Sequence, residues 1–360
     1  MFAPIDNAGS RIALERAQAA TLAYPIDPFL PLAGSIGATP RAVDEHRVDQ
    51  YAEHYSVSVQ QALPWRFITQ IGYVGNQGYH MLDRSYMNLI DPLTGRRALP
   101  FGRVDIKSSG SATSFNGLQP SLQRPSVAGF LLGAQYMFSH AYDEGSLGGG
   151  ESTAPQNVSC RSCEWAHTNQ DIRHTFTMNW VYELPIGAGR KYMQNSGALE
   201  HLLGGWQVSG LLQARTGRPL TITVTRSSAD LPDGNNSSQR ADAVPGVSPI
   251  PANQTPDQWL NLAAFAVPAR GTWGNVERNT LRGPSLLQVD LALQKQFPIG
   301  GGRHGQFRWE AFNAFNRQNL GNPNTNISSG VSFGRITGPL NLGYGTGTAR
   351  QMQFMLRVNF

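Results

Sequence analysis

The sequence has few of the features that mark helical membrane proteins or proteins that bind nucleic acids. Only 15% of its 360 residues are charged, and it has two cysteines. It contains no run of about 18 uncharged apolar residues, which excludes a conventional transmembrane helix. The net charge of +5 comes from basic residues that are scattered along the chain. A nucleic-acid partner is therefore not expected, because such partners favour clustered basic residues with interleaved aromatics.

Motifs for catalysis or for binding a cofactor are also missing. The sequence has no H-E-x-x-H motif, no nucleophile elbow and no convincing catalytic triad. The glycines at 300–302 lack the Gly-Lys-Ser/Thr ending of a phosphate-binding loop. We therefore expect a protein that is not an enzyme and carries no cofactor.

Turn-forming residues are abundant, with 39 glycines and 23 prolines, as suits many strands joined by turns. In the last eleven residues apolar and polar side chains alternate, as in a strand with one apolar face. Similar alternation recurs near residues 53–62, 65–75, 114–124, 129–142, 171–184, 205–216, 286–297 and 306–316. The pattern predicts about nine strands of roughly ten residues, the length that crosses a bilayer at a tilt.

The connections between these strands are of two kinds. Those at 62–64, 125–128 and 298–303 are short, and the one at 185–204 is somewhat longer. They alternate with long polar segments at about 76–113, 143–170, 217–284 and 318–347. Short periplasmic turns and long extracellular loops are typical of outer-membrane barrels. A secreted β-sandwich that binds carbohydrate explains the alternation equally well, but it explains the asymmetry of the loops poorly.

The predicted fold is therefore an all-β, antiparallel transmembrane barrel segment whose strand residues divide into two sets. The set expected to face lipid is Leu287, Val289, Leu291, Phe307, Trp309, Phe354, Leu356 and Val358. The set expected to face the lumen is Asp290, Arg308, Glu310, Gln353 and Arg357. These polar residues suit a wet interior, because a dry core would leave them without partners.

The long loops contain candidates for binding and for a disulfide. Cys160 and Cys163 are expected to form a disulfide in an exported loop. Zinc bound with His167 and His174 is the alternative, although His174 falls within a predicted strand, so no metal is expected. Trp165, Trp259 and Trp273 are candidates to stack on a ligand, or equally to pack the loops together.

Several segments carry a resemblance to a known family. They are DIRHTF at 171–176, WVYELP at 180–185, GGWQVSG at 204–210, NTLRGP at 279–284 and EAFNAFN at 310–316. In this order they resemble strands of TonB-dependent receptor-like outer-membrane proteins. The most similar group is the Oar-like branch, whose members carry a carboxypeptidase-regulatory-like domain ahead of the plug. The resemblance covers residues 40–360 approximately.

The resemblance implies a larger barrel of about 22 strands with a plugged lumen, of which this chain holds the carboxy-terminal part. It implies uptake of a bulky nutrient of the siderophore, cobalamin or glycan class, powered through TonB. The implied partners are outer-membrane lipid, the barrel assembly machinery, the nutrient, and the TonB system acting through an amino-terminal plug. Phe360, an aromatic residue that ends an alternating strand, resembles the signal read by the assembly machinery.

The amino-terminal residues do not resemble a signal peptide, because no charged region is followed by an apolar one. Residues 1–45 are rich in Pro, Gly and Ala and are expected to form an irregular, extracellular-loop-like segment before the barrel part at 46–360. We expect the chain to be a fragment of a longer receptor. The alternative function is a barrel-anchored surface protein for binding or adhesion, without transport.

Overall fold

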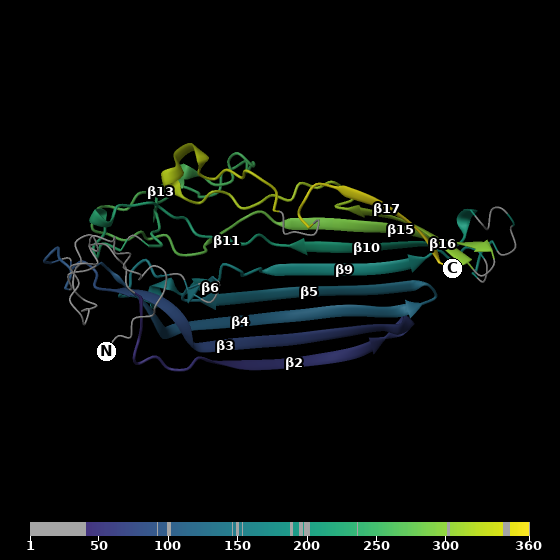
Figure 1. Cartoon of the computed structure of the whole chain (residues 1–360), viewed down its shortest axis with the longest axis horizontal. Helices are drawn as coiled ribbons and strands as arrows, with labels where there is room; N and C mark the ends of the chain where they lie inside the picture. The colour runs from purple at the N-terminus through teal and green to yellow at the C-terminus, as the bar shows by residue number, and fades with distance from the viewer. Residues whose placement is uncertain are drawn as a thin grey trace, which may run out of the picture.

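The structure, a computed structural model, describes residues 41–360 except for 92, 99–101, 146, 149–150, 153, 188–189, 194–196, 198–201, 236, 301–302, 341–345 and 360. Nine long strands form one antiparallel sheet that runs along the long axis of the molecule (Figure 1). They are β2 (Tyr51–Leu63), β3 (Phe67–Met87), β4 (Val104–Val127), β5 (Phe130–Asp143), β9 (His174–Glu183), β10 (Trp206–Arg215), β15 (Leu286–Gly300), β16 (Arg303–Phe312) and β17 (Gln351–Asn359). The predicted antiparallel β fold is confirmed.

The remaining elements are short. The strands among them are β1 (Arg41–Val43), β6 (Leu147–Gly148), β7 (Glu151–Ser152), β8 (Ala166–His167), β11 (Pro219–Leu220), β12 (Asp242–Ala243), β13 (Phe265–Ala266) and β14 (Leu281–Arg282). The 3-10 turns are η1 (Pro64–Arg66), η2 (Ser162–Glu164), η3 (Ser228–Asp230), η4 (Leu262–Ala264) and η5 (Ile327–Ser332). None of the helices in this part of the chain is long and apolar enough to span a bilayer.

Each long strand pairs with the next long strand along the chain, in the order β2-β3-β4-β5-β9-β10-β15-β16-β17. Within the described ranges, β2 and β17 each have one strand neighbour, so the sheet is not closed. Backbone groups on an unpaired strand edge are costly in lipid, because no water is present to bond them.

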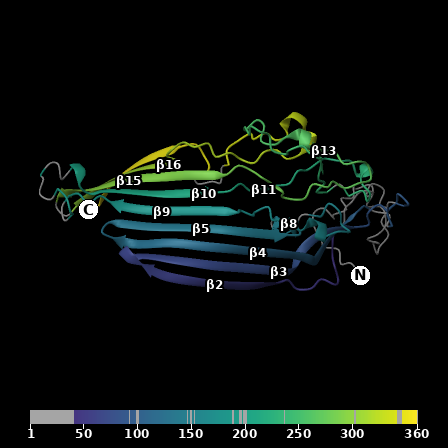
Figure 2. The ribbon, with the colours of Figure 1, turned by 180° about the vertical axis from the view of Figure 1, so that it is seen from behind.

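The short connections lie together at one end of the sheet, and the long loops gather at the other (Figure 2). The β4–β5 hairpin turns through Ala128 and Gly129, both with positive φ (51° and 78°), a backbone twist that suits a two-residue hairpin. Pro298, the first residue of the predicted connection at 298–303, still belongs to the β15–β16 ladder. It pairs with His304, and the register shifts between Pro298 and Gly300.

The prediction of a long polar loop at 76–113 is wrong for most of that segment. β3 continues to Met87 and β4 begins at Val104, so the two strands have 21 and 24 residues. Crossing a bilayer takes only about 9–11 residues, so each of these strands is about twice as long as a crossing requires. Each face of the hairpin there mixes apolar and charged side chains, such as Tyr86 with Asp105 on one face and Ile106 with Asp83 on the other, so the apolar alternation that identifies a strand in the sequence is absent.

Two further predictions fall partly or wholly outside the described residues. Of the segment predicted to be irregular, 1–45, residues 41–43 form β1, which pairs in parallel with β4 at residues 105–107. Residues 1–40 lie outside the described part of the chain. Phe360, the predicted assembly signal, also lies outside it.

Candidate functional site

The register of the sheet separates its apolar side chains from its polar ones. Residues directly opposed in an antiparallel pair point to the same face. Phe307 opposes Leu356, and Trp309 opposes both Leu293 and Phe354. The same face holds the other members of the predicted lipid-facing set, namely Leu287, Val289, Leu291 and Val358. That this face contacts lipid stays a prediction.

All five residues predicted to face the lumen lie on the opposite face. Glu310 of β16 opposes Gln353 of β17. The Glu310 carboxylate accepts a hydrogen bond from the Gln353 side-chain amide and forms an ion pair with Arg308. Asp290 accepts hydrogen bonds from Gln288 Nε2 at 2.8 Å and from the backbone N–H of Asn313 at 2.7 Å. The structure thus brings Arg308, Glu310 and Gln353 into one cluster. Asp290 has other partners, and Arg357 is exposed.

An unbroken row of uncharged polar side chains crosses seven strands on this second face. Directly opposed from strand to strand, its members are Gln60, Gln70, Ser121, Gln135, Thr177, Gln213 and Gln288. Four of them, from Gln70 to Thr177, line a hollow of about 550 Å³. Amide and hydroxyl groups both donate and accept hydrogen bonds, so the row suits contact with water or with a polar partner.

The long loops fold into a cap at the end of the sheet opposite the short turns. We call the loop cap the described residues of 144–173, 216–285 and 313–350. It has a hydrophobic core of its own, drawn from the second and third loops. This core consists of Ile222, Val224, Ala241, Leu260, Val276, Ile327 and Phe333. The cap is therefore a folded unit in its own right.

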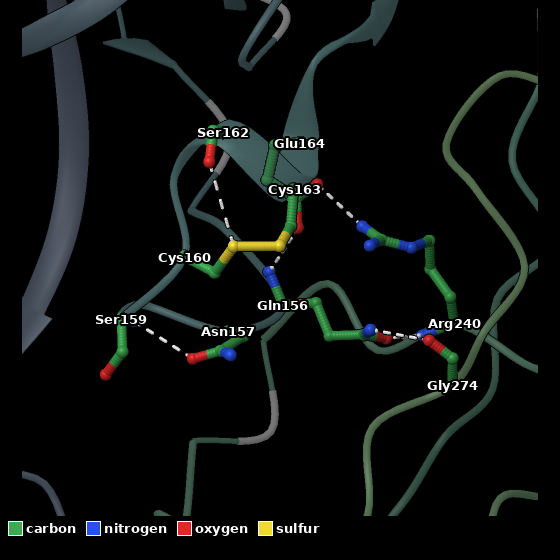
Figure 3. The surroundings of a disulfide bond; sticks show 9 residues. All are labelled: Gln156, Asn157, Ser159, Cys160, Ser162, Cys163, Glu164, Arg240 and Gly274. Carbon is green, nitrogen blue, oxygen red and sulfur yellow. Dashed lines mark hydrogen bonds and ion pairs between the residues drawn. A yellow bond between two sulfur atoms is a disulfide. The ribbon is translucent and has the colours of Figure 1, made fainter.

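Glu164 connects the first loop of the cap to the second. Its carboxylate accepts from Arg240 at 2.6 Å and from the backbone N–H of Gln156 at 3.0 Å (Figure 3). The Glu164 and Arg240 side chains are only 4% and 6% exposed. Arg278 donates to the Glu164 carbonyl at 3.0 Å and also pairs with Asp143. Buried charges are tolerated only when paired in this way, so removing one partner is costly.

Cys160 and Cys163 form a disulfide directly before Glu164, with their Cα atoms 5.4 Å apart (Figure 3). The bond closes a tight turn that leads into η2, where Glu164 is positioned. The alternative use of these residues was a metal site. Within the described ranges no three His, Cys, Asp or Glu residues are grouped so as to hold a metal ion.

A second buried ion pair joins two of the sequence motifs. Asp171 is 1% exposed and pairs with Arg282, which also donates to the Asp171 carbonyl at 2.6 Å. The other carboxylate oxygen of Asp171 accepts from the N–H of Ala141 at 2.9 Å, which ties the pair to the end of β5. Sequence reasoning missed this pair because 111 residues separate its members, although each lies in a conspicuous motif.

The three candidate tryptophans lie in different surroundings. Trp165 is 45% exposed, and its ring stacks on Tyr142 with centroids 6.0 Å apart. Trp259 packs against the cap core and donates from Nε1 to the Arg282 carbonyl at 3.4 Å. Trp273 is half-buried, and its Nε1 makes no hydrogen bond with any of the described residues. Their roles in ligand binding stay predictions.

The cap contains a cleft of about 400 Å³ where its three loops meet. Polar residues from each loop contribute to the lining, among them Asn169, Thr221 and Asn322. Arg240 and Arg278 also line the cleft, but their charges are already paired with Glu164 and Asp143. Elsewhere in the cap, burial raises the pKa of Asp233 above its ordinary value.

Comparison with known proteins identifies the family. A family model described as an outer membrane beta barrel domain matches residues 6–353. The chain belongs to this family. It is accordingly a protein of the Gram-negative outer membrane. No curated protein sequence matches the chain.

Solved structures with a similar arrangement are much longer than this chain. The outer membrane transporter YddB from Escherichia coli is 10% identical to this chain, with a TM-score of 0.45. The match covers 89% of this chain and 34% of YddB. The pyoverdine outer membrane receptor FpvA from Pseudomonas aeruginosa PAO1 is 12% identical, with a TM-score of 0.39 and coverages of 86% and 30%. The chain thus spans about a third of the length of these proteins.

Proposed function

We propose that this chain is the carboxy-terminal part of the barrel of a TonB-dependent receptor that takes up a bulky nutrient of the siderophore, cobalamin or glycan class. The observation that carries the proposal is the uncharged polar row, from Gln60 to Gln288, opposite a continuous apolar face. A barrel used only to anchor its loops needs no wide interior lined with hydrogen-bonding groups. A receptor needs one, to hold water, a soluble domain or a passing ligand.

The other partners follow from the same proposal. The apolar face contacts membrane lipid, and the assembly machinery reads β17 and its terminal Phe360. The TonB system acts through a plug domain of the whole receptor. The nutrient first meets the loop cap, where the cleft offers neutral polar groups. The protein works by binding and translocation and is not an enzyme.

Gene deletion tests this function, with uptake of labelled nutrients as the readout. Cells that lack the complete gene, and separately cells that lack TonB, are offered a ferric siderophore, cobalamin and an oligosaccharide. We expect uptake of one class to fall in both strains and to return when the gene is restored. The class that falls identifies the substrate.

A matched variant links the result to the polar row. Gln135→Leu together with Gln213→Leu replaces two of the seven polar side chains of the row with apolar ones and removes no charge, and uptake should fall although the protein reaches the outer membrane. Normal uptake of all three classes in the deletion strain, with a loss of attachment to surfaces, would contradict transport. That outcome would favour the barrel-anchored adhesion protein instead.

A further inference from the structure

A stack of aromatic and histidine rings follows the outer end of β5. The side chains of Tyr136, Phe138, His140 and Tyr142 share one face of this strand, since they are two residues apart. Phe138 opposes Leu118 of β4, and Tyr136 opposes Phe176 of β9. These partners lie on the apolar face of the sheet. The ring stack is therefore continuous with the surface assigned to lipid.

The short strand β8 extends this surface into the first cap loop. His167 opposes Tyr142 in the β5–β8 pair, and the two rings stack with centroids 4.4 Å apart. Trp165 stacks on the same tyrosine, with an angle of 11° between the ring planes. His140 lies 6.2 Å from His167, between centroids. Tyr142 thus holds both cap residues on the outward face.

The chemistry of the stack changes along the strand. Leu132 and Ala134 are apolar, Tyr136 and Phe138 are aromatic, and His140 begins the polar part. This order matches the passage from hydrocarbon to headgroups, where rings with a polar edge are enriched. Trp165, at the outer end, keeps 45% of its surface exposed.

Cationic groups lie beside the polar end of the stack. Arg173 Nη2 is 3.3 Å from His167 Nε2, and the Arg173 side chain is 29% exposed. Asp171 is the carboxylate near it, 3.9 Å away, but Asp171 also pairs with Arg282. Two guanidinium groups and one carboxylate leave a local excess of one positive charge. Guanidinium groups bind phosphate oxygens strongly, so the excess suits a phosphorylated ligand.

We infer that Trp165, Tyr142 and Arg173 form a binding site for the phosphorylated saccharide headgroup of an outer-leaflet glycolipid. The indole face stacks on the sugar, and Arg173 contacts the phosphate. In this assignment Trp165 faces the membrane and does not contact the nutrient. The inference rests on the apolar face being the lipid-facing one. It is independent of transport, because an adhesion barrel would carry the same site.

Site-specific photo-crosslinking in cells tests the assignment in the intact protein. Benzoylphenylalanine replaces Trp165, Phe138 or Gln135 in three separate variants, and irradiated samples are probed with antibody against the glycolipid. Gln135 lies on β5 but on the polar face, so it is the matched control. We expect a glycolipid-bearing band of lower mobility from positions 165 and 138, and none from 135.

The absence of the adduct at 165 would overturn the inference. The result at 138 then shows whether the facing assignment failed as well, since an adduct at 138 leaves that assignment in place. Arg173→Gln in the position-165 variant tests the phosphate contact. The adduct should be largely lost with glutamine and retained with Arg173→Lys, which keeps the charge. An undiminished adduct with glutamine would remove Arg173 from the site and refute the proposal of a phosphate ligand.

Discussion

Leu356 offers the sharpest test of which face of the sheet meets lipid. It lies one residue from the midpoint of β17, is 69% exposed and opposes Phe307 of β16. Leu356→Arg would place a guanidinium group in the hydrocarbon. Arginine on the lipid face near the bilayer midplane costs about 2–4 kcal/mol. This corresponds to an unfolding equilibrium shifted by about 30- to 700-fold.

The neighbouring residue supplies the matched control. Arg357 is exposed on the other face, opposite Gln306, so Arg357→Leu should change the unfolding free energy by at most about 0.5 kcal/mol. Leu356→Ala separates the loss of the leucine from the introduction of charge. The measurement is urea unfolding of the full-length protein in lipid vesicles, together with the amount of assembled protein in outer membranes. Equal unfolding free energies for Leu356→Arg and Arg357→Leu would refute the facing assignment.

Three further predictions concern the loop cap. Arg240→Ala leaves Glu164 buried without its ion-pair partner and should destabilise the cap by about 3–5 kcal/mol, seen as faster proteolysis of 144–173 and 216–285. Arg270→Ala, which removes an exposed pair with Asp230, is the control, and equal proteolysis of both variants would contradict the buried-pair argument. Replacing Cys160 and Cys163 by serine should cost at most about 2 kcal/mol, because the closed loop is short, and complete loss of the folded cap would show a larger role. Burial raises the pKa of Asp233 above its ordinary value of 3.8. Between these two pKa values the folded cap binds more protons than the unfolded chain, so the stability of the cap falls as the pH rises. The contribution is lost once the pH has passed the raised pKa. Asp233→Asn should therefore flatten the pH dependence of cap stability, and an unchanged pH profile would exclude Asp233 as its source.

Strand positions within the membrane could be predicted because the bilayer imposes a period of two on the side chains. β9, β10 and β17 begin and end within a few residues of the predicted segments. The same period divided the residues of β15, β16 and β17 into an apolar and a polar set. The registers of these three strands place each set on one face of the sheet. Neither result needed any knowledge of distant contacts.

The extension of β3 and β4 could not be predicted in this way. Asp83 pairs with Ser108, and Arg84 with Lys107, in a ladder whose two faces each mix apolar and polar side chains, as where Ser85 opposes Ile106 and Tyr86 opposes Asp105. Because neither face is uniformly apolar, the residues carry no alternation to mark them. Their strand conformation comes from backbone pairing between the two segments and from contacts such as the ion pair of Arg84 with Asp105, 2.7 Å long.

The sequence by itself determined the class of this protein: an antiparallel barrel sheet, its strand number, and which side chains share a face. These properties are local, because alternation and turn residues act within a few positions of the chain. Only the tertiary structure decided how the loops fold, since Glu164 and Arg240, or Asp171 and Arg282, are far apart in the sequence and meet without any periodic signal. It also decided that Trp165 stacks on Tyr142, because that contact depends on the pairing of β5 with β8.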